Sequence, residues 1–233
     1  NMDICCVSEI SIPGNGSFTM NVPLSKQCFR LYYSGPCDGK GLYGVGIALS
    51  NSLVHLVHEF KAVSSRIAIL ELSSRPICST IVSVYAPTNQ ASDIEIEEFY
   101  DALNTTLQAI PRKNFLVLAG DFNAQFGPPE YRRETGRNTF GNQCANGTRL
   151  LNLAANHNLV AINTLFSHKK RHLTTWLSPD GKTRNQIDHI FINQRWKTAV
   201  LDCRSYWGTF VQTDHALIVA SIKLRLSTKK HLI

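Results

Sequence analysis

The segment that most constrains the fold is Phe115–Ala119, an uninterrupted apolar run followed directly by a glycine and an aspartate. Such a run is typical of a strand that is buried on both faces. Other segments that are rich in alternating or β-branched apolar residues also read as strands. They lie at 66–72, 77–85, 159–162, 187–192 and 216–224. A chain with this many buried strands needs further layers of structure to cover them.

Two segments have the apolar spacing of amphipathic helices. The first begins at Ser92, where Glu95 completes a capping box, and ends at Pro111. The second spans about 148–156. Acidic residues gather in the first helix, where the helix dipole favours them, and we interpret them as a solvated face. We expect residues 1–233 to form one α/β domain, a layered sandwich with helices covering the sheets.

Composition and cysteine usage limit the class of protein. At 43% hydrophobic residues the chain can bury a core, which excludes a disordered chain. It has no apolar run near the ~18 residues of a membrane span, and its start lacks the basic region of a secretory signal. The 7 cysteines include no Cys-x-x-Cys, which argues against a disulfide framework or structural zinc. We therefore predict reduced thiols in a nuclear or cytoplasmic protein, not a secreted or membrane one.

The charge is unevenly distributed along the chain. The 24 basic and 17 acidic residues give a net charge of +7, and segment 92–110 holds five of the acidic residues and no basic ones. The remainder carries 24 − 12 = +12. A positive surface with one acidic face is suited to a polyanion such as DNA, although such charge also serves solubility.

Polar residues follow the buried strand 115–119 directly. Gly120 allows the backbone to turn, and Asp121 and Asn123 then project at the carboxyl end of the strand, a common place for active sites in layered α/β folds. An acid beside an amide can activate and orient a water molecule. The alternative is an Asx turn that merely ends the strand.

Two further motifs supply an acid and an imidazole. Asp214 and His215 stand just before the strand at 216–224, and Asp188 interrupts the apolar strand at 187–192. A carboxylate within an apolar strand is costly unless it is paired, and His215 is a plausible partner. A carboxylate behind an imidazole fixes its tautomer and stabilises its protonated form.

Glu9 and Tyr85 also end predicted strands. Glu9 follows an apolar run, and one or two carboxylates with few other charges suit Mg²⁺, which prefers oxygen ligands and keeps several waters. Tyr85 precedes Ala86-Pro87, where its hydroxyl could contact a phosphate. The alternatives are an ordinary strand end for Glu9 and a core aromatic for Tyr85.

A basic run precedes an aromatic residue in the last third of the chain. Lys169, Lys170 and Arg171 could bind a phosphate backbone, with Thr175 and the ring of Trp176 beside them. The alternative for the run is a solvated loop.

The order of these motifs resembles the exonuclease–endonuclease–phosphatase superfamily over essentially the whole chain. The sequence reads Glu9, Tyr85-Ala86-Pro87-Thr88, Gly120-Asp121-Phe122-Asn123, Thr175-Trp176, Ile187-Asp188-His189-Ile190 and Thr213-Asp214-His215. A narrower resemblance is to endonuclease domains of non-LTR, LINE-type retrotransposons of the RTE-like group and the related craniofacial-development-protein-like sequences. It is carried by Asn146–Leu151, Asn163–Phe166, Thr175–Gly181 and Asn185–Asp188.

The resemblance implies a four-layer DNase I-like sandwich, two β-sheets face to face with helices outside. It also implies roles: Glu9 binds Mg²⁺, which Mn²⁺ could replace, and Asp214 assists the metal or water. Asp121 activates the attacking water, Asn123 orients it or the phosphate, and Tyr85 contacts the scissile phosphate. Asp188 holds His215, which stabilises the charge of the pentavalent phosphorus.

The chain departs from the family pattern in several places. Ser8 stands where Gln is usual, His189 where Tyr is common and Thr213 where Ser is common. The family also has an earlier strand carrying an Asn near the metal, and here the chain begins within the Glu9 strand. We therefore expect the domain to lack its first strand, which would expose a sheet edge.

The expected function is Mg²⁺-dependent nicking of DNA that leaves 3′-hydroxyl and 5′-phosphate ends. In a retrotransposon, that hydroxyl would prime the reverse transcriptase domain that follows in the parent element. The alternatives are another superfamily phosphoesterase, such as an abasic-site endonuclease or a phosphatase, and a catalytically decayed nucleic-acid-binding module.

Overall fold

The computed structural model describes residues 2–23, 25, 27–36, 43–128, 132–208 and 213–224. A four-stranded antiparallel sheet is built from the N-terminal quarter of the chain in the order β1-β4-β3-β2. Its strands are β1 (Ile4–Ser8), β2 (Asn15–Asn21), β3 (Cys28–Ser34) and β4 (Val45–Ser50). Among the described residues β1 pairs only with β4, so its other edge is open.

A six-stranded sheet forms the centre of the molecule in the order β5-β6-β7-β8-β12-β9. Neighbouring strands run antiparallel except β7 and β8, which are parallel. The strands are β5 (Val57–Ser64), β6 (Ile67–Leu72), β7 (Ser79–Tyr85), β8 (Phe115–Asp121), β12 (Asp188–Asn193) and β9 (Leu159–Ala161). The apolar run 115–119 is therefore a strand in the interior of this sheet, as its sequence predicts.

Two antiparallel pairs of strands complete the fold. They are β10 (Trp176–Leu177) with β11 (Arg184–Asn185), and β13 (Val200–Tyr206) with β14 (Leu217–Ile222). Among the described residues β14 pairs only with β13, so one of its edges is open as well.

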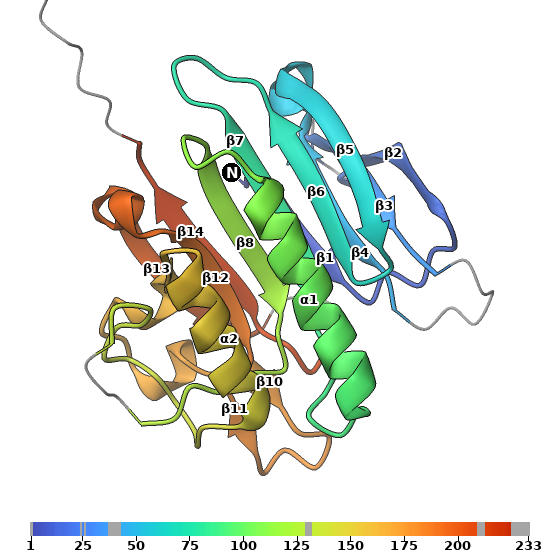
Figure 1. The fold of residues 1–233 in the computed structure, drawn as a ribbon. Helices are drawn as coiled ribbons and strands as arrows, with labels where there is room; N and C mark the ends of the chain where they lie inside the picture. Colours follow the sequence, from blue (N-terminus) through green and yellow to red (C-terminus); the bar gives the residue numbers. More distant parts are fainter. Residues whose placement is uncertain are drawn as a thin grey trace, which may run out of the picture.

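Helices α1 (Asp93–Ala109) and α2 (Ala145–Asn156) pack on the six-stranded sheet. Leu103 of α1 and Leu150 of α2 share one buried cluster with Val82 and Leu118 of the sheet. A second cluster joins Ile47 and residues such as Ile81 on the other side, between the two larger sheets. Figure 1 shows both helices on one side of the six-stranded sheet and the four-stranded sheet on the other. This confirms the expected α/β sandwich.

The helix starts differ from the sequence prediction in two details. Ser92 caps α1 by accepting the Glu95 amide, but the Glu95 carboxylate pairs with Arg66 at 2.6 Å instead of completing a capping box. Helix α2 begins three residues before the predicted start, at Ala145, because the Cys144 sulfur accepts the Gly147 amide. Cysteine is not among the usual N-cap residues, so the sequence carried no signal for this start.

Candidate active site

Three predicted site residues lie side by side at the ends of adjacent strands. Asp121 is the last residue of β8, and strand register places it opposite Tyr85 of β7 on one side and Asp188 of β12 on the other. These residues are far apart in the sequence. The sheet therefore brings a phenol and two carboxylates together where three neighbouring strands begin or end.

Asp121 is nearly enclosed, with 4% of its surface exposed. Its Oδ1 accepts the backbone amide of Asn123 at 2.9 Å. Burial, and next the negative charge of Asp188, raises the pKa of Asp121 to about 8, although His215 and the Asn123 amide act in the opposite direction. A carboxylate in such a site accepts protons more readily than an exposed one, which suits a general base.

His215 forms an ion pair with Asp188. Its Nδ1 lies 3.1 and 3.0 Å from the two carboxylate oxygens. Burial alone would lower the pKa of His215, but the hydrogen bond and charge of Asp188 outweigh it and raise this pKa to about 9. The imidazole is therefore protonated at neutral pH and carries a positive charge toward the centre of the site.

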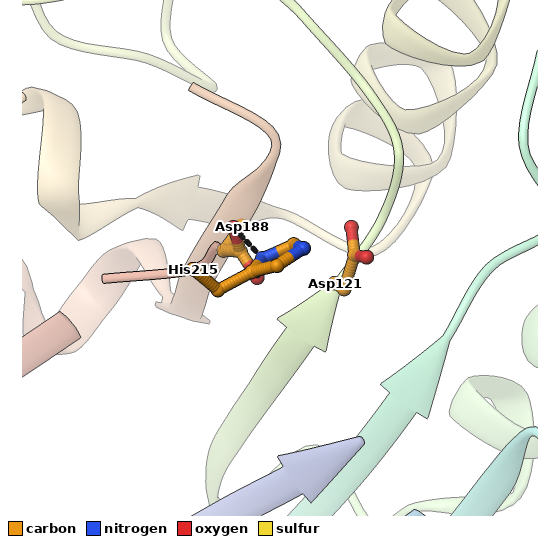
Figure 2. A group of neighbouring side chains, drawn as sticks. All are labelled: Asp121, Asp188 and His215. Atoms are coloured by element: carbon orange, nitrogen blue, oxygen red, sulfur yellow. Dashed lines mark hydrogen bonds and ion pairs between the residues drawn. The ribbon is translucent and has the colours of Figure 1, made fainter. Parts of the chain in front are cut away.

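The two aspartates and the imidazole form one compact group. Asp121, Asp188 and His215 each offer a ligand atom, and these atoms all lie within 4.8 Å of one another. Figure 2 shows the imidazole between the two carboxylates. The two carboxylates offer the oxygen ligands that Mg²⁺ prefers, whereas the protonated imidazole has no lone pair to offer a metal ion.

Glu9 joins the site through Tyr85, whose hydroxyl donates a 2.6 Å hydrogen bond to Glu9 Oε1. Glu9 directly follows β1 and has a positive φ of 58°. Burial, together with this hydrogen bond to an anion, raises the pKa of Tyr85 well above its usual range, so the phenol stays neutral and acts as a donor. Glu9 also raises the pKa of Asp121, which places both carboxylates in one electrostatic environment.

Asp214 is held by Trp176. The indole Nε1 donates to Asp214 Oδ2 at 2.8 Å, and the backbone amide of Leu177 donates to the Asp214 carbonyl at 2.9 Å. Trp176 and His215 also form an isolated β-bridge. Trp176 therefore positions the Asp214–His215 segment, a role that its sequence context did not indicate.

Thr175 does not lie where a DNA contact would require it. Only 1% of its surface is exposed, and its hydroxyl accepts the amides of Ile187 and Asp188 at 3.0 and 3.1 Å. The prediction that Thr175 binds nucleic acid is therefore wrong, because a buried side chain cannot reach a phosphate backbone. It holds the start of β12 instead.

The basic run lies on the surface. Lys169, Lys170 and Arg171 are exposed, in and beside a short 3-10 helix at Lys170–His172. This segment is attached to β13, where Ser205 Oγ donates to the Arg171 carbonyl and the Ser205 carbonyl accepts His172 Nδ1. The position leaves the cationic groups available to a phosphate backbone.

Asn123 is anchored by a network that the sequence did not reveal. It has a positive φ of 47°, and its Nδ2 donates to the Ala86 carbonyl at 3.0 Å. Its own carbonyl accepts Asn89 Nδ2 at 2.8 Å and Asn146 Nδ2 at 3.4 Å. Asn146 is fully buried at the start of α2 and was noticed only as part of a family-like segment.

His189 holds the loop that follows Asn123. It is buried, stacks on Phe126 at 4.2 Å, and donates from Nε2 to the Ala124 carbonyl at 2.8 Å. Burial lowers the pKa of His189 to about 4, so the ring is neutral at physiological pH. The residue that replaces the usual Tyr thus serves a structural purpose.

This geometry agrees with a family match. Residues 79–219, which include Tyr85, Asp121 and His215, match the family described as endonuclease–reverse transcriptase. The chain belongs to this family. The assignment confirms the resemblance of the sequence motifs to those of non-LTR retrotransposon endonucleases.

The chain is also similar to curated proteins named craniofacial development protein 2. It is 32% identical to those of Tragulus javanicus and Bos taurus over 226 residues, which is 97% of this chain. It spans 38% and 37% of their lengths, so they contain much more than this domain.

Solved structures share the fold at low sequence identity. The endonuclease domain of TRAS1, a telomere-specific non-LTR retrotransposon, has a TM-score of 0.62 and 17% identity, covering 85% of this chain and 81% of that one. The AP endonuclease LMAP from Leishmania major has a TM-score of 0.68 and 14% identity, covering 96% and 79%. The 3′-5′ exonuclease NExo from Neisseria meningitidis has a TM-score of 0.67 and 18% identity, covering 95% and 90%. No described helix combines the length and apolar character that a bilayer crossing requires.

Proposed function

We propose that this domain is a Mg²⁺-dependent endonuclease that nicks DNA and leaves 3′-hydroxyl and 5′-phosphate ends. The observation that carries the proposal is the alignment of Tyr85, Asp121 and Asp188 across three strands, with His215 paired to Asp188. The arrangement supplies a base, an imidazolium and a phenol around one position. Membership of the endonuclease–reverse transcriptase family and the basic surface support DNA as the substrate.

In the proposed reaction Asp121 takes a proton from a water molecule that Asn123 helps to orient. The water oxygen attacks phosphorus in line, the bond from phosphorus to O3′ breaks, and the departing oxygen receives a proton from solvent water. The His215 imidazolium and the Tyr85 hydroxyl stabilise the negative charge that develops on the phosphoryl oxygens. Asp188 keeps the imidazole oriented and protonated throughout.

Glu9 and the second oxygen of Asp214 are the proposed ligands for Mg²⁺, which Mn²⁺ could replace. When bound, the cation would polarise the scissile phosphate and neutralise part of its charge. Both carboxylates lie near the proposed catalytic residues, since the charge of Glu9 acts on Asp121 and that of Asp214 acts on His215, and carboxylate oxygens are the ligands that Mg²⁺ prefers. The Tyr85 hydroxyl binds only one carboxylate oxygen of Glu9, and the Trp176 indole binds only one of Asp214. The other oxygen of each carboxylate is left for the cation.

The test is conversion of supercoiled plasmid to open circles, with and without Mg²⁺, followed by labelling of the new ends. We expect nicking that a chelator abolishes, and ends that a polymerase extends without phosphatase treatment. His215→Ala should lose at least ~100-fold in rate, as loss of a transition-state charge partner typically does. Faster turnover of small phosphate monoesters or of abasic-site DNA than of intact plasmid would support the alternative phosphoesterase functions, and DNA binding without turnover would indicate a decayed module.

A further inference from the structure

A second candidate site lies beside the proposed active site, in a pocket of about 440 Å³. Arg171 and His172 line it from the basic segment, Arg184 from β11, and Tyr206 and Trp207 from the end of β13. The pocket therefore combines two guanidinium groups with aromatic rings. Neither the family match nor the proposed catalytic residues account for this combination.

The pocket is cationic because two arginines line it and no carboxylate does. Neither Arg171 nor Arg184 forms an ion pair within the described ranges. The nearby Asp202 of β13 is paired with Arg204 at 2.9 Å and with His168 at 2.7 Å. Both lining guanidiniums are thus available to an external anion, for which their planar donors suit a phosphate.

The lining groups are held in place by contacts within the pocket. His172 Nδ1 donates to the Ser205 carbonyl at 2.9 Å, so its Nε2 is free to accept the Arg171 Nε at 3.1 Å. The Arg184 guanidinium lies 5.3 Å from the centre of the Trp207 ring. The Trp207 Nε1 is shielded from solvent and finds no acceptor among the described residues. The lining groups of the pocket therefore hold one another in position.

Strand pairing places this pocket next to the catalytic segment. Tyr206 is opposite Leu217, two residues after His215. Arg184 is opposite Leu177, whose amide donates to the Asp214 carbonyl. A DNA strand that crosses the active site would need only a short extension to reach the pocket.

We propose that this pocket is a nucleotide-binding subsite that holds one unpaired nucleotide of the DNA strand flanking the cut. Arg171 and Arg184 bind its phosphate, and Tyr206 and Trp207 contact the face of its base. The base must be unpaired, because stacking on a side chain requires a ring face that duplex stacking would cover. This subsite rests on the proposed function, since the strand that it holds is the one being cleaved.

The test measures binding of the whole chain to two fluorescent oligonucleotides in the presence of a chelator, so that no cleavage occurs. One is an octamer of thymidine, and the other has the same phosphates but abasic sugars. We expect the thymidine octamer to bind about tenfold more tightly, the difference that one stacked base provides. Trp207→Leu should remove that difference, whereas Arg184→Gln should weaken binding of both probes. Lys182→Gln, an exposed change in the same hairpin, is the matched control.

The binding measurements can overturn the proposed subsite in two ways. Equal affinities of the wild-type chain for both octamers would overturn the subsite, as would wild-type binding by Arg184→Gln. Arg184 is exposed, so its variant remains informative even if Trp207→Leu unfolds. A chain that shows this binding pattern but never nicks plasmid would refute the proposed endonuclease and leave the subsite standing. A chain that nicks plasmid, and whose octamer binding is unaltered in Trp207→Leu and Arg184→Gln, would refute the subsite and leave the endonuclease standing.

Discussion

Thr175 and Asp188 are joined by a 3.1 Å hydrogen bond from the Asp188 amide to the Thr175 hydroxyl. The same hydroxyl accepts the Ile187 amide, so one buried side chain fixes the start of β12. The Asp188 carboxylate is in turn bonded to His215. The orientation of the imidazole therefore depends on a buried residue that does not contact the imidazole itself.

This relationship predicts a loss of catalysis in Thr175→Val. Valine keeps the shape but leaves two amides unsatisfied, which typically costs ~1–3 kcal/mol for each buried group. We expect kcat to fall by about tenfold, KM to change little and the alkaline limb of the pH profile to move, because His215 loses its fixed partner. Thr175→Ser restores the hydroxyl and should recover most of the rate. A fall in stability with an unmoved pH profile would assign Thr175 a purely structural role.

Replacing Asp121 by Asn should abolish nicking and stabilise the fold. Loss of a general base typically costs ~10²–10⁴ in rate. An amide retains the acceptor for Asn123 but removes a buried charge beside Asp188. Retention of more than about half of the activity would reject Asp121 as the base.

The stability gain in Asp121→Asn should depend on pH. The pKa of Asp121 rises from 3.8 to about 8 on folding, so between these values the folded chain holds a proton that the unfolded chain has released. The stability that the wild-type chain gains from binding this proton is therefore lost as pH rises. We expect the Tm difference from wild type to grow by at least about 3 °C between pH 5 and pH 9, the shift that ~1 kcal/mol produces in a chain of this size. Thermal unfolding with a chelator measures it, and a constant difference would contradict the burial argument.

The ion pair between Asp188 and His215 predicts a second pH effect. The proposed mechanism requires the protonated imidazole, so the wild-type nicking rate should fall above about pH 9. In Asp188→Asn the pKa of His215 should drop, because burial then acts without the opposing carboxylate. The alkaline limb should move downward by at least about one pH unit. Rate profiles of the two proteins at saturating Mg²⁺ provide the comparison, and coincident limbs would remove His215 from the proposed mechanism.

Neutralising Lys169, Lys170 and Arg171 together should weaken DNA binding for all sequences. Loss of up to three phosphate contacts would reduce the log–log salt slope by up to ~2.7. Binding of a labelled duplex from low to physiological salt measures this slope. The same number of Gln substitutions at Lys61, Lys113 and Lys197, away from this segment, serves as a control. An unchanged slope would make the basic run a solvated loop.

A strand that pairs with the open edge of β1 should improve the proposed metal site. Among the described residues, β1 and β14 each have an open edge, and Glu9 directly follows β1. A strand joined upstream of Asn1 that pairs with β1 would restrain Glu9, and loss of such support typically costs ~10–100-fold in metal affinity or activity. We expect a lower Mg²⁺ midpoint for nicking in the extended chain. Equal midpoints and equal rates for the two chains would show that the strand is dispensable.

Much of the local structure could be predicted from sequence because it depends on neighbouring residues. The apolar run 115–119, the helical spacing after Ser92 and the stop at Pro111 each reflect short-range periodicity or backbone chemistry. The pairing of Asp188 with His215 was also predictable, since an isolated carboxylate in an apolar strand requires a partner. The family resemblance then supplied roles that no single motif could justify.

Tertiary structure decided which side chains meet and which are enclosed. The register that aligns Tyr85, Asp121 and Asp188 depends on pairing between strands that are distant in sequence. Burial cannot be read from a motif. It removes Thr175 from the surface, so that its hydroxyl holds the start of β12, and it raises the pKa of Asp121. Sequence alone therefore determined the elements and the chemical inventory of this domain. Only the packed sheets determined the environment that gives those groups their charge and position, because desolvation and strand register are properties of the folded chain.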